Sequence, residues 1–368
     1  MAKGLDVGTM NIICAIKGDG SISFTQQRNA FLEMEANDLT RHMLDNSKVL
    51  YTHKDNQLNV LGEDAFKFST VFNKHIRRPM KQGIISPDEK ESIPMIRVIL
   101  ERVIGAPEKD DEVLYVSVPA NPVDNQLNVL YHSKTVEALA RKLGYNTFPI
   151  DEGLAVVYSE LSDSNFTGIG VSIGAGMTNV TVAYMATPIV SFSIARGGDW
   201  IDEQVSIATG MAKERITSIK ETDFSIGSEY EIGSVQGALA VYYDALLTYV
   251  LQHLKRKLSE TAPPDAEFQV AIAGGGTRAR GFVEMFERRL KEANLPIRIS
   301  GVKKSKFVNP AGTDSRDPIY AIARGCLIAA LTKEASLIPE VQENQAPKFQ
   351  ATKAHGKAAV AVGSGGGD

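Results

Sequence analysis

The stretch that decides the fold is Gly4-Leu5-Asp6-Val7-Gly8-Thr9, which has the pattern of a strand that runs into a glycine turn. An apolar run at 12–16 follows at once, so that strand, tight turn and returning strand form a hairpin pattern. The same pattern recurs at 170–176, before a second strand-like segment, Val180-Thr181-Val182. Two copies are too few for a solenoid, which needs at least three repeats, so the repetition predicts a two-lobed protein.

Between and after these hairpins, strands alternate with helices. The run 113–118 is typical of a buried strand, and 268–276 combines a strand with three consecutive glycines. Helical periodicity covers roughly 121–143, and leucines from 239 to 258 indicate a long amphipathic helix. This alternation predicts the α/β fold class.

Length and composition limit the class of protein. At roughly 150 residues per domain, 368 residues suggest about 2.5 domains. Forty Lys plus Arg against 44 Asp plus Glu leave a net charge of -4, so nucleic acid is not expected as a direct partner. Two cysteines, Cys14 and Cys326, exclude a disulfide framework, and no apolar run reaches a membrane-spanning length. We therefore expect a cytoplasmic protein.

Three glycine loops follow credible strands, at Gly8, at 174–176 and at 274–276. Without a Cβ atom, glycine lets backbone N–H groups converge on an anion. The first loop also carries Asp6 and Asn11, a carboxylate that suits magnesium and a polar group that suits phosphate. Neither the Walker pattern nor a complete G-x-G-x-x-G is present there, which disfavours P-loop and Rossmann folds.

The segment Asp6-Val7-Gly8-Thr9 resembles the first phosphate motif of the superfamily that contains actins, heat-shock chaperones and sugar kinases. Within it, the chain is most similar to bacterial actins of the MreB and MamK type, from Gly4 to about Leu331. The further segments that carry this resemblance, in the order of the family, are 78–85, 150–155, 197–199, 273–281 and 317–325.

The resemblance implies a two-lobed actin-like ATPase fold, in which each lobe is a mixed sheet flanked by helices and the nucleotide lies in the cleft between lobes. It divides the chain as follows: lobe I at 1–27, 76–165 and 318–338, a small subdomain at 28–75, lobe II at 166–317 with a small insert at about 205–235, and a tail at 339–368. The composition of that tail predicts that it is flexible.

The resemblance also implies a site for ATP and magnesium, with Asp6 holding the metal through water. The residues expected to contact the nucleotide are Gly8, Thr9, Met10, Asn11, Gly174, Ala175, Gly176, Gly198, Glu214, Thr217, Gly274, Gly275, Gly276 and Thr277. Thr217 stands where the family has lysine, which removes one expected adenosine contact.

For hydrolysis, the resemblance places Glu152 where a side chain polarises the attacking water and Thr178 where a hydroxyl helps to place it, with Asp6 beside them. A glutamate at a helix start is also common as a residue that faces the helix dipole, so this alternative stays open for Glu152. Ser172 stands where the family has an aspartate that organises the magnesium waters. Serine brings no charge, so we expect nucleotide binding to be retained better than turnover, and catalytic ATPase activity stays open.

The function that the resemblance implies is a cytoskeletal protein that polymerises into cytoplasmic filaments for positioning, segregation or cell organisation. Its expected partners are further copies of itself, stacked head to tail in paired strands, and a cytoplasmic adaptor or cargo protein. Direct membrane insertion is not expected, because the loop 105–111 is charged. Alternatives on the same fold are a chaperone-type ATPase switch or a small-molecule kinase; the tail is too short for a peptide-binding domain, and nothing isolates a substrate base.

Overall fold

The computed structural model describes residues 2–18, 21–227, 229–231, 233–261, 263–303 and 317–337. The segment 339–368, for which the composition predicts a flexible tail, lies outside the described residues.

One five-stranded sheet has the order β10-β9-β1-β2-β3. Its strands are β1 (Lys3–Val7), β2 (Asn11–Lys17), β3 (Ile22–Arg28), β9 (Val113–Val118) and β10 (Asn146–Asp151). The first hairpin of the sequence is β1 with β2, antiparallel up to the pair Val7 and Ile12. Strand β9 pairs in parallel with both β1 and β10, so the sheet is mixed.

The second five-stranded sheet has the order β13-β12-β11-β14-β15 and repeats this topology. Its strands are β11 (Gly168–Ile173), β12 (Thr178–Tyr184), β13 (Thr187–Ile194), β14 (Glu267–Ala273) and β15 (Arg298–Lys303). Here too an antiparallel hairpin, β11 with β12, is extended by a third antiparallel strand on one side and two parallel strands on the other. The duplicated architecture predicted from the two glycine hairpins is confirmed, and each sheet defines a lobe.

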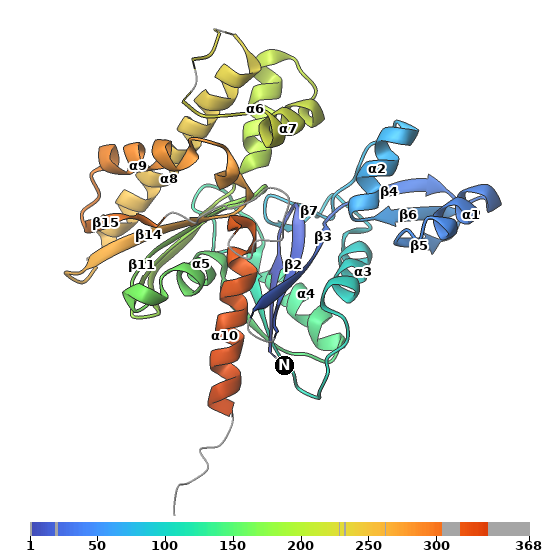
Figure 1. The fold of residues 1–368 in the computed structure, drawn as a ribbon, viewed down its shortest axis with the longest axis horizontal. Helices are drawn as coiled ribbons and strands as arrows, with labels where there is room; N and C mark the ends of the chain where they lie inside the picture. The colour runs from blue at the N-terminus through green and yellow to red at the C-terminus, as the bar shows by residue number, and fades with distance from the viewer. Residues whose placement is uncertain are drawn as a thin grey trace, which may run out of the picture.

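Helices cover the outer faces of the two sheets and fill the space between them (Figure 1). They are α3 (Ser92–Ile104), α4 (Val129–Lys142), α5 (Glu152–Glu160), α8 (Val235–Thr261), α9 (Phe282–Ala293) and α10 (Ala321–Leu337). Helix α10 returns to the first lobe and lies so close to β1 that a Cβ atom on Gly4 would be 2.1 Å from the Leu327 nitrogen. Glycine is therefore needed at position 4 for this helix to close the lobe.

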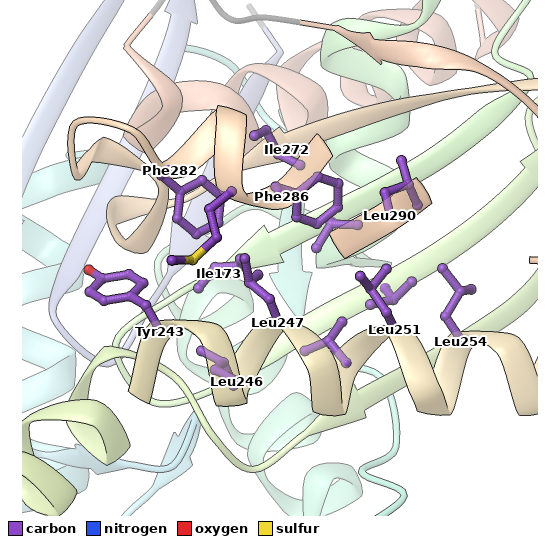
Figure 2. Packing of buried hydrophobic residues seen from close by; sticks show 14 of the residues in the cluster. Ile173, Tyr243, Leu246, Leu247, Leu251, Leu254, Ile272, Phe282, Phe286 and Leu290 are labelled. Atoms are coloured by element: carbon purple, nitrogen blue, oxygen red, sulfur yellow. The ribbon is translucent and has the colours of Figure 1, made fainter. Parts of the chain in front are cut away.

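The second lobe has the largest core. Leucines recur every three or four positions along α8, as the sequence predicts, and this stripe packs against Phe282 and Phe286 of α9 and against Ile173 and Ile272 of the sheet (Figure 2). Burying a side chain of this size stabilises the fold by roughly 1.5–3 kcal/mol. This core holds β11 and β14, and hence the loops that follow them, in fixed positions.

Each lobe carries a smaller group of elements, and Figure 1 shows the two groups as separate projections. In the first lobe, a three-stranded sheet of order β4-β6-β5 packs with two helices; the elements are β4 (Phe31–Glu35), α1 (Asp38–Asn46), β5 (Tyr51–Lys54), β6 (Gln57–Leu61) and α2 (Glu63–Phe72). A two-stranded hairpin follows, β7 (Met80–Lys81) with β8 (Ile84–Ile85). In the second lobe, α6 (Gly198–Thr209) and α7 (Lys213–Thr222) form the projection.

The helix predicted from about 121 begins at Val129 instead, where Asn128 caps it by accepting a hydrogen bond from the Tyr131 amide. The preceding residues cross to the other lobe, where the Val123 amide donates to the Ser193 carbonyl of β13 over 2.9 Å. Long-range pairing has therefore overridden the local helical pattern. The two-lobed, mixed α/β fold class is confirmed, whereas the exact domain boundaries stay a prediction.

Candidate functional site

A cleft of about 1010 Å³ lies between the lobes and is lined by residues of both. The sequence-predicted residues that line it are Asp6, Gly8, Thr9, Met10, Asn11, Glu152, Gly174, Ala175, Gly176, Gly198, Gly274, Gly275 and Gly276. Four further predicted residues, Thr178, Glu214, Thr217 and Thr277, are not among the lining residues. The structure thus brings all three glycine loops together at one cavity.

The first two loops are matching turns at the ends of the two hairpins. The Gly8 amide donates to the Asn11 carbonyl over 2.9 Å, and the Gly174 amide donates to the Met177 carbonyl over 2.9 Å. Within the described part of the chain, the amides between these closures, at 9–10 and 175–176, donate no hydrogen bond to the protein. Unpaired amides that converge from two turns are donors suited to an anion such as a phosphate.

The two turns lie against each other at Gly176. A Cβ atom there would be 2.4 Å from the Thr9 hydroxyl oxygen and 2.4 Å from the Gly83 nitrogen. The Gly83 amide, in the turn between β7 and β8, in turn donates to the Thr9 hydroxyl over 3.1 Å. Only glycine lets the second loop approach the first lobe this closely.

The N-terminus of α6 supports the second loop from behind. The Gly198 amide donates to the Gly174 carbonyl over 2.9 Å, and the Asp199 amide donates to the Ala175 carbonyl over 2.8 Å. Because these carbonyls are held toward the helix, the amides of the loop are free to face the cleft. The positive end of the helix dipole also lies here, which favours a negatively charged ligand.

Two acids, Asp6 at the end of β1 and Glu152 at the start of α5, are buried at the base of the cleft. Asp6 accepts a hydrogen bond of 2.8 Å from Ser117, which lowers its pKa, but burial away from water dominates and raises the pKa. Burial likewise raises the pKa of Glu152, and the nearby Asp6 charge adds to that rise. Two neighbouring carboxylates that each resist ionisation favour a cation beside them.

These donors fit a magnesium nucleotide. Magnesium in proteins is commonly held by one or two carboxylates together with waters and phosphate oxygens, so a full protein cage is not needed. No cluster of three or more His, Cys, Asp or Glu side chains that could hold a metal occurs within the described residues. Asp6 and Glu152 would supply the carboxylates, and the two glycine turns would supply the amides.

Glu152 is held in one orientation by neutral partners. Its Oε2 accepts a hydrogen bond of 2.9 Å from the Asn179 side chain and lies 3.3 Å from the Ser172 hydroxyl, which donates to it. The Asn179 side-chain oxygen accepts from the Ala120 amide over 3.0 Å, which fixes the direction of its amide group. The Ser172 hydroxyl therefore supports Glu152 without adding a charge.

The predicted hydroxyl at Thr178 has a local partner. It is fully buried, and its Oγ1 donates to the Arg196 carbonyl over 2.9 Å. Thr277 in the third loop behaves in the same way, since its Oγ1 donates to the Gly274 carbonyl over 2.8 Å. Each hydroxyl is therefore used to hold the local backbone, and neither residue lines the cleft.

On α7 the structure places different side chains in the cleft from those expected. Glu214 is exposed outside it, and Thr217 donates to Asp202 over 2.7 Å. Lys220 and Glu221, one turn further on, line the cleft instead. The Lys220 ammonium donates to Asp202 over 2.7 Å and to the Gly198 carbonyl over 2.9 Å. These residues were not identified from the sequence, because helical periodicity does not show which polar residues of a helix face another lobe.

Comparison with solved structures identifies the fold. The MamK double helical filament matches with a TM-score of 0.65 at 18% identity, covering 89% of this chain and 98% of that one. MreB5 of Spiroplasma citri matches in its AMPPNP-bound form (TM-score 0.60, 13% identity, 91% and 97% covered) and its ADP-bound form (TM-score 0.61, 14% identity, 91% and 97% covered). The fold is therefore that of the bacterial actins.

A family model resolves the relationship further. The volactin model matches residues 1–330, so the chain belongs to the volactin family. No curated protein matches the chain. No helix within the described residues has the length and apolar character needed to cross a membrane.

Proposed function

We propose that this protein binds ATP with magnesium in the interlobe cleft. The observation that carries the proposal is the convergence of two glycine turns, with unpaired amides at 9–10 and 175–176, above the buried acids Asp6 and Glu152. The MreB5 structures of the same fold hold AMPPNP and ADP, which supports a nucleotide as the ligand. Asp6 would hold magnesium through water, and the third glycine loop, with Lys220 and Glu221, would line the nucleoside end.

Magnesium bound with the nucleotide would neutralise phosphate charge and so favour attack by water on the terminal phosphate. Glu152 would orient that water, because Ser172 and Asn179 occupy Oε2 and leave Oε1 for it. With serine at 172 in place of the aspartate of related actins, one charge that would organise the magnesium waters is missing. We therefore propose that binding is retained while hydrolysis is slow.

We further propose that the nucleotide-bound subunits polymerise head to tail into cytoplasmic filaments that position or segregate a cargo through an adaptor. MamK, which shares the fold, forms a double helical filament, and this supports self-association in paired strands. A head-to-tail contact joins two different surfaces, so it leaves both ends open for growth. The division into two lobes, with a small subdomain at 28–75 and an insert at about 205–235, belongs to the same proposal.

One experiment tests both nucleotide binding and polymerisation. The protein is mixed with ATP and magnesium, centrifuged at high speed, and the pellet is imaged by electron microscopy, while a fluorescent ATP analogue measures binding to the supernatant. Filaments that require ATP and magnesium support the proposal. Asp6→Ala should form no filaments. If the protein instead stays a monomer, binds ATP and phosphorylates a small molecule, the proposal is contradicted and a kinase is favoured.

A further inference from the structure

An ion pair joins the two lobes beside the second glycine loop. Arg78 belongs to the first lobe and Asp199 to α6 of the second, and the Arg78 Nη1 donates to both carboxylate oxygens of Asp199 over 2.9 and 2.8 Å. Their side chains are only 25% and 22% exposed. A charge-assisted contact that water reaches poorly is stronger than an exposed surface pair.

Both partners are connected, through short stretches of chain and hydrogen bonds, to residues that line the cleft. Arg78 lies two residues before Met80, which is buried in the core of the first lobe. Strand β7 then leads directly into Gly83, whose amide donates to Thr9 of the first glycine loop. On the other side, the Asp199 amide donates to the carbonyl of Ala175 in the second loop. The ion pair therefore connects the supports of the two loops.

We propose that the Arg78–Asp199 pair is an interlobe clamp, which holds the second glycine loop against Thr9 and sets the rate at which nucleotide leaves the cleft. The rate part rests on the proposed nucleotide binding. Separation of the lobes breaks the pair and withdraws the loop from the first lobe at the same time. Arg78 acts here as a positioning residue, because it reaches the ligand only through Asp199 and the loop.

A second, longer contact crosses the same opening. Arg28 of β3 lies 3.3 Å from Glu63 of its own lobe and 4.0 Å from Glu221 of α7, and its side chain is 28% exposed. At that distance the pair with Glu221 contributes less than the clamp. This weaker pair provides a comparison for the test, because Arg28→Gln should speed nucleotide release less than Arg78→Gln.

The charge of Asp199 distinguishes the two halves of the clamp. Arg78→Gln leaves an uncompensated carboxylate, which lines the cleft beside the phosphate-binding amides and repels the ligand. Asp199→Asn breaks the same ion pair but removes that repulsion. Arg78→Gln should therefore speed nucleotide release more than Asp199→Asn, and the exchange Arg78→Asp with Asp199→Arg should restore part of the slow release.

The first measurement follows displacement of a fluorescent ATP analogue by excess ATP in a stopped-flow instrument. We expect release to be about fivefold faster in Arg78→Gln than in wild type. This difference between the two release rates should shrink as the salt concentration rises, because salt screens the ion pair. Arg97→Gln is the matched control, since Arg97 pairs with Glu101 over 2.8 Å within one helix of one lobe. Equal release rates in wild type and Arg78→Gln would overturn the proposal.

The second measurement needs no nucleotide, so it stays informative if the protein binds none. Spin labels at Val71→Cys on α2 and Ser218→Cys on α7, both exposed, report the separation of the lobes. Labelling is selective because Cys14 and Cys326 are fully buried. The clamp predicts a longer and broader distance distribution in Arg78→Gln and Asp199→Asn than in Arg97→Gln. Identical distributions would refute it, whereas absence of nucleotide binding in wild type would refute the proposed function alone.

Discussion

At the scale of single residues, the base of the cleft combines two acids that resist ionisation with two neutral supports, Ser172 and Asn179. Ser172 is fully buried and donates to Glu152, so its hydroxyl stabilises the glutamate in one orientation. A carboxylate in its place would add a third negative charge to a group that burial already disfavours. The serine thus avoids that repulsion, and under the proposed function it supplies no charge for the waters of a bound magnesium ion.

These two opposing effects of the serine predict the effect of Ser172→Asp. With ATP and magnesium, single-turnover phosphate release should rise about tenfold, equivalent to about 1.4 kcal/mol of barrier, because the new carboxylate organises the magnesium waters. Without magnesium the variant should unfold at a lower temperature than wild type. Ser172→Ala controls for loss of the hydroxyl and should not speed release. Wild-type release as fast as that of Ser172→Asp would contradict the proposed slow hydrolysis.

The raised pKa values of Asp6 and Glu152 predict how stability depends on pH. In the unfolded chain these acids ionise near pH 4, whereas in the fold they keep protons to higher pH. Above pH 4 the folded state therefore binds more protons than the unfolded state, and the free energy of unfolding falls as pH rises toward the raised values. Glu152→Gln should remove about 1–2 kcal/mol of that fall in protein free of magnesium and nucleotide.

His132 titrates in the opposite sense and must be separated from the acids. Burial lowers its pKa to about 4, so its contribution to stability rises with pH between about 4 and its ordinary value of 6.5. The comparison is therefore the difference between Glu152→Gln and wild type in urea titrations at pH 5, 6, 7 and 8, in which the His132 contribution cancels. Parallel curves for the two proteins would show that Glu152 is ionised normally.

At the scale of elements, the contact between the two glycine turns predicts a selective effect of Gly176→Ala. The new methyl group would overlap Thr9 and Gly83, so the lobes must separate, at a cost of about 1–3 kcal/mol in unfolding free energy. Gly275→Ala is the control, because a Cβ atom there has open space around it. Thermal unfolding of both variants checks this: similar melting temperatures would mean that the turns do not press together.

The extent to which the sequence predicts the structure differs from element to element. The hairpins could be predicted because alternation and a glycine turn are local signals, and the acid at position 6 followed from its place at a strand end. The orientation of α7 could not, since periodicity shows which side of a helix is apolar but not which residues face another lobe; Lys220 lines the cleft, whereas Glu214 does not. Likewise, the pairing of Val123 with β13 depends on a strand far away in the chain.

At the scale of the whole molecule, two lobes with the same sheet topology face one cleft, and each ends in a smaller projection (Figure 1). Ligands that contact both lobes stabilise their closed arrangement and leave the projections in a defined relative position. In a head-to-tail polymer, the next subunit would contact the projections and bind best when they are in that position. Among the described residues, the small subdomain exposes three large apolar side chains, and the two most exposed are Leu39 of α1 (80% exposed) and Val71 of α2 (74% exposed).

This arrangement predicts that Leu39→Lys with Val71→Lys will impair polymerisation and spare nucleotide binding. Burial of each side chain against a second copy of the chain contributes roughly 1.5–3 kcal/mol, so the critical concentration should rise at least tenfold. Leu130→Lys makes the same change at a leucine of α4 that is 69% exposed and lies outside the small subdomain. Sedimentation over a concentration series measures the critical concentration of wild type, the double variant and Leu130→Lys. An unchanged critical concentration in the double variant would place the longitudinal contact elsewhere.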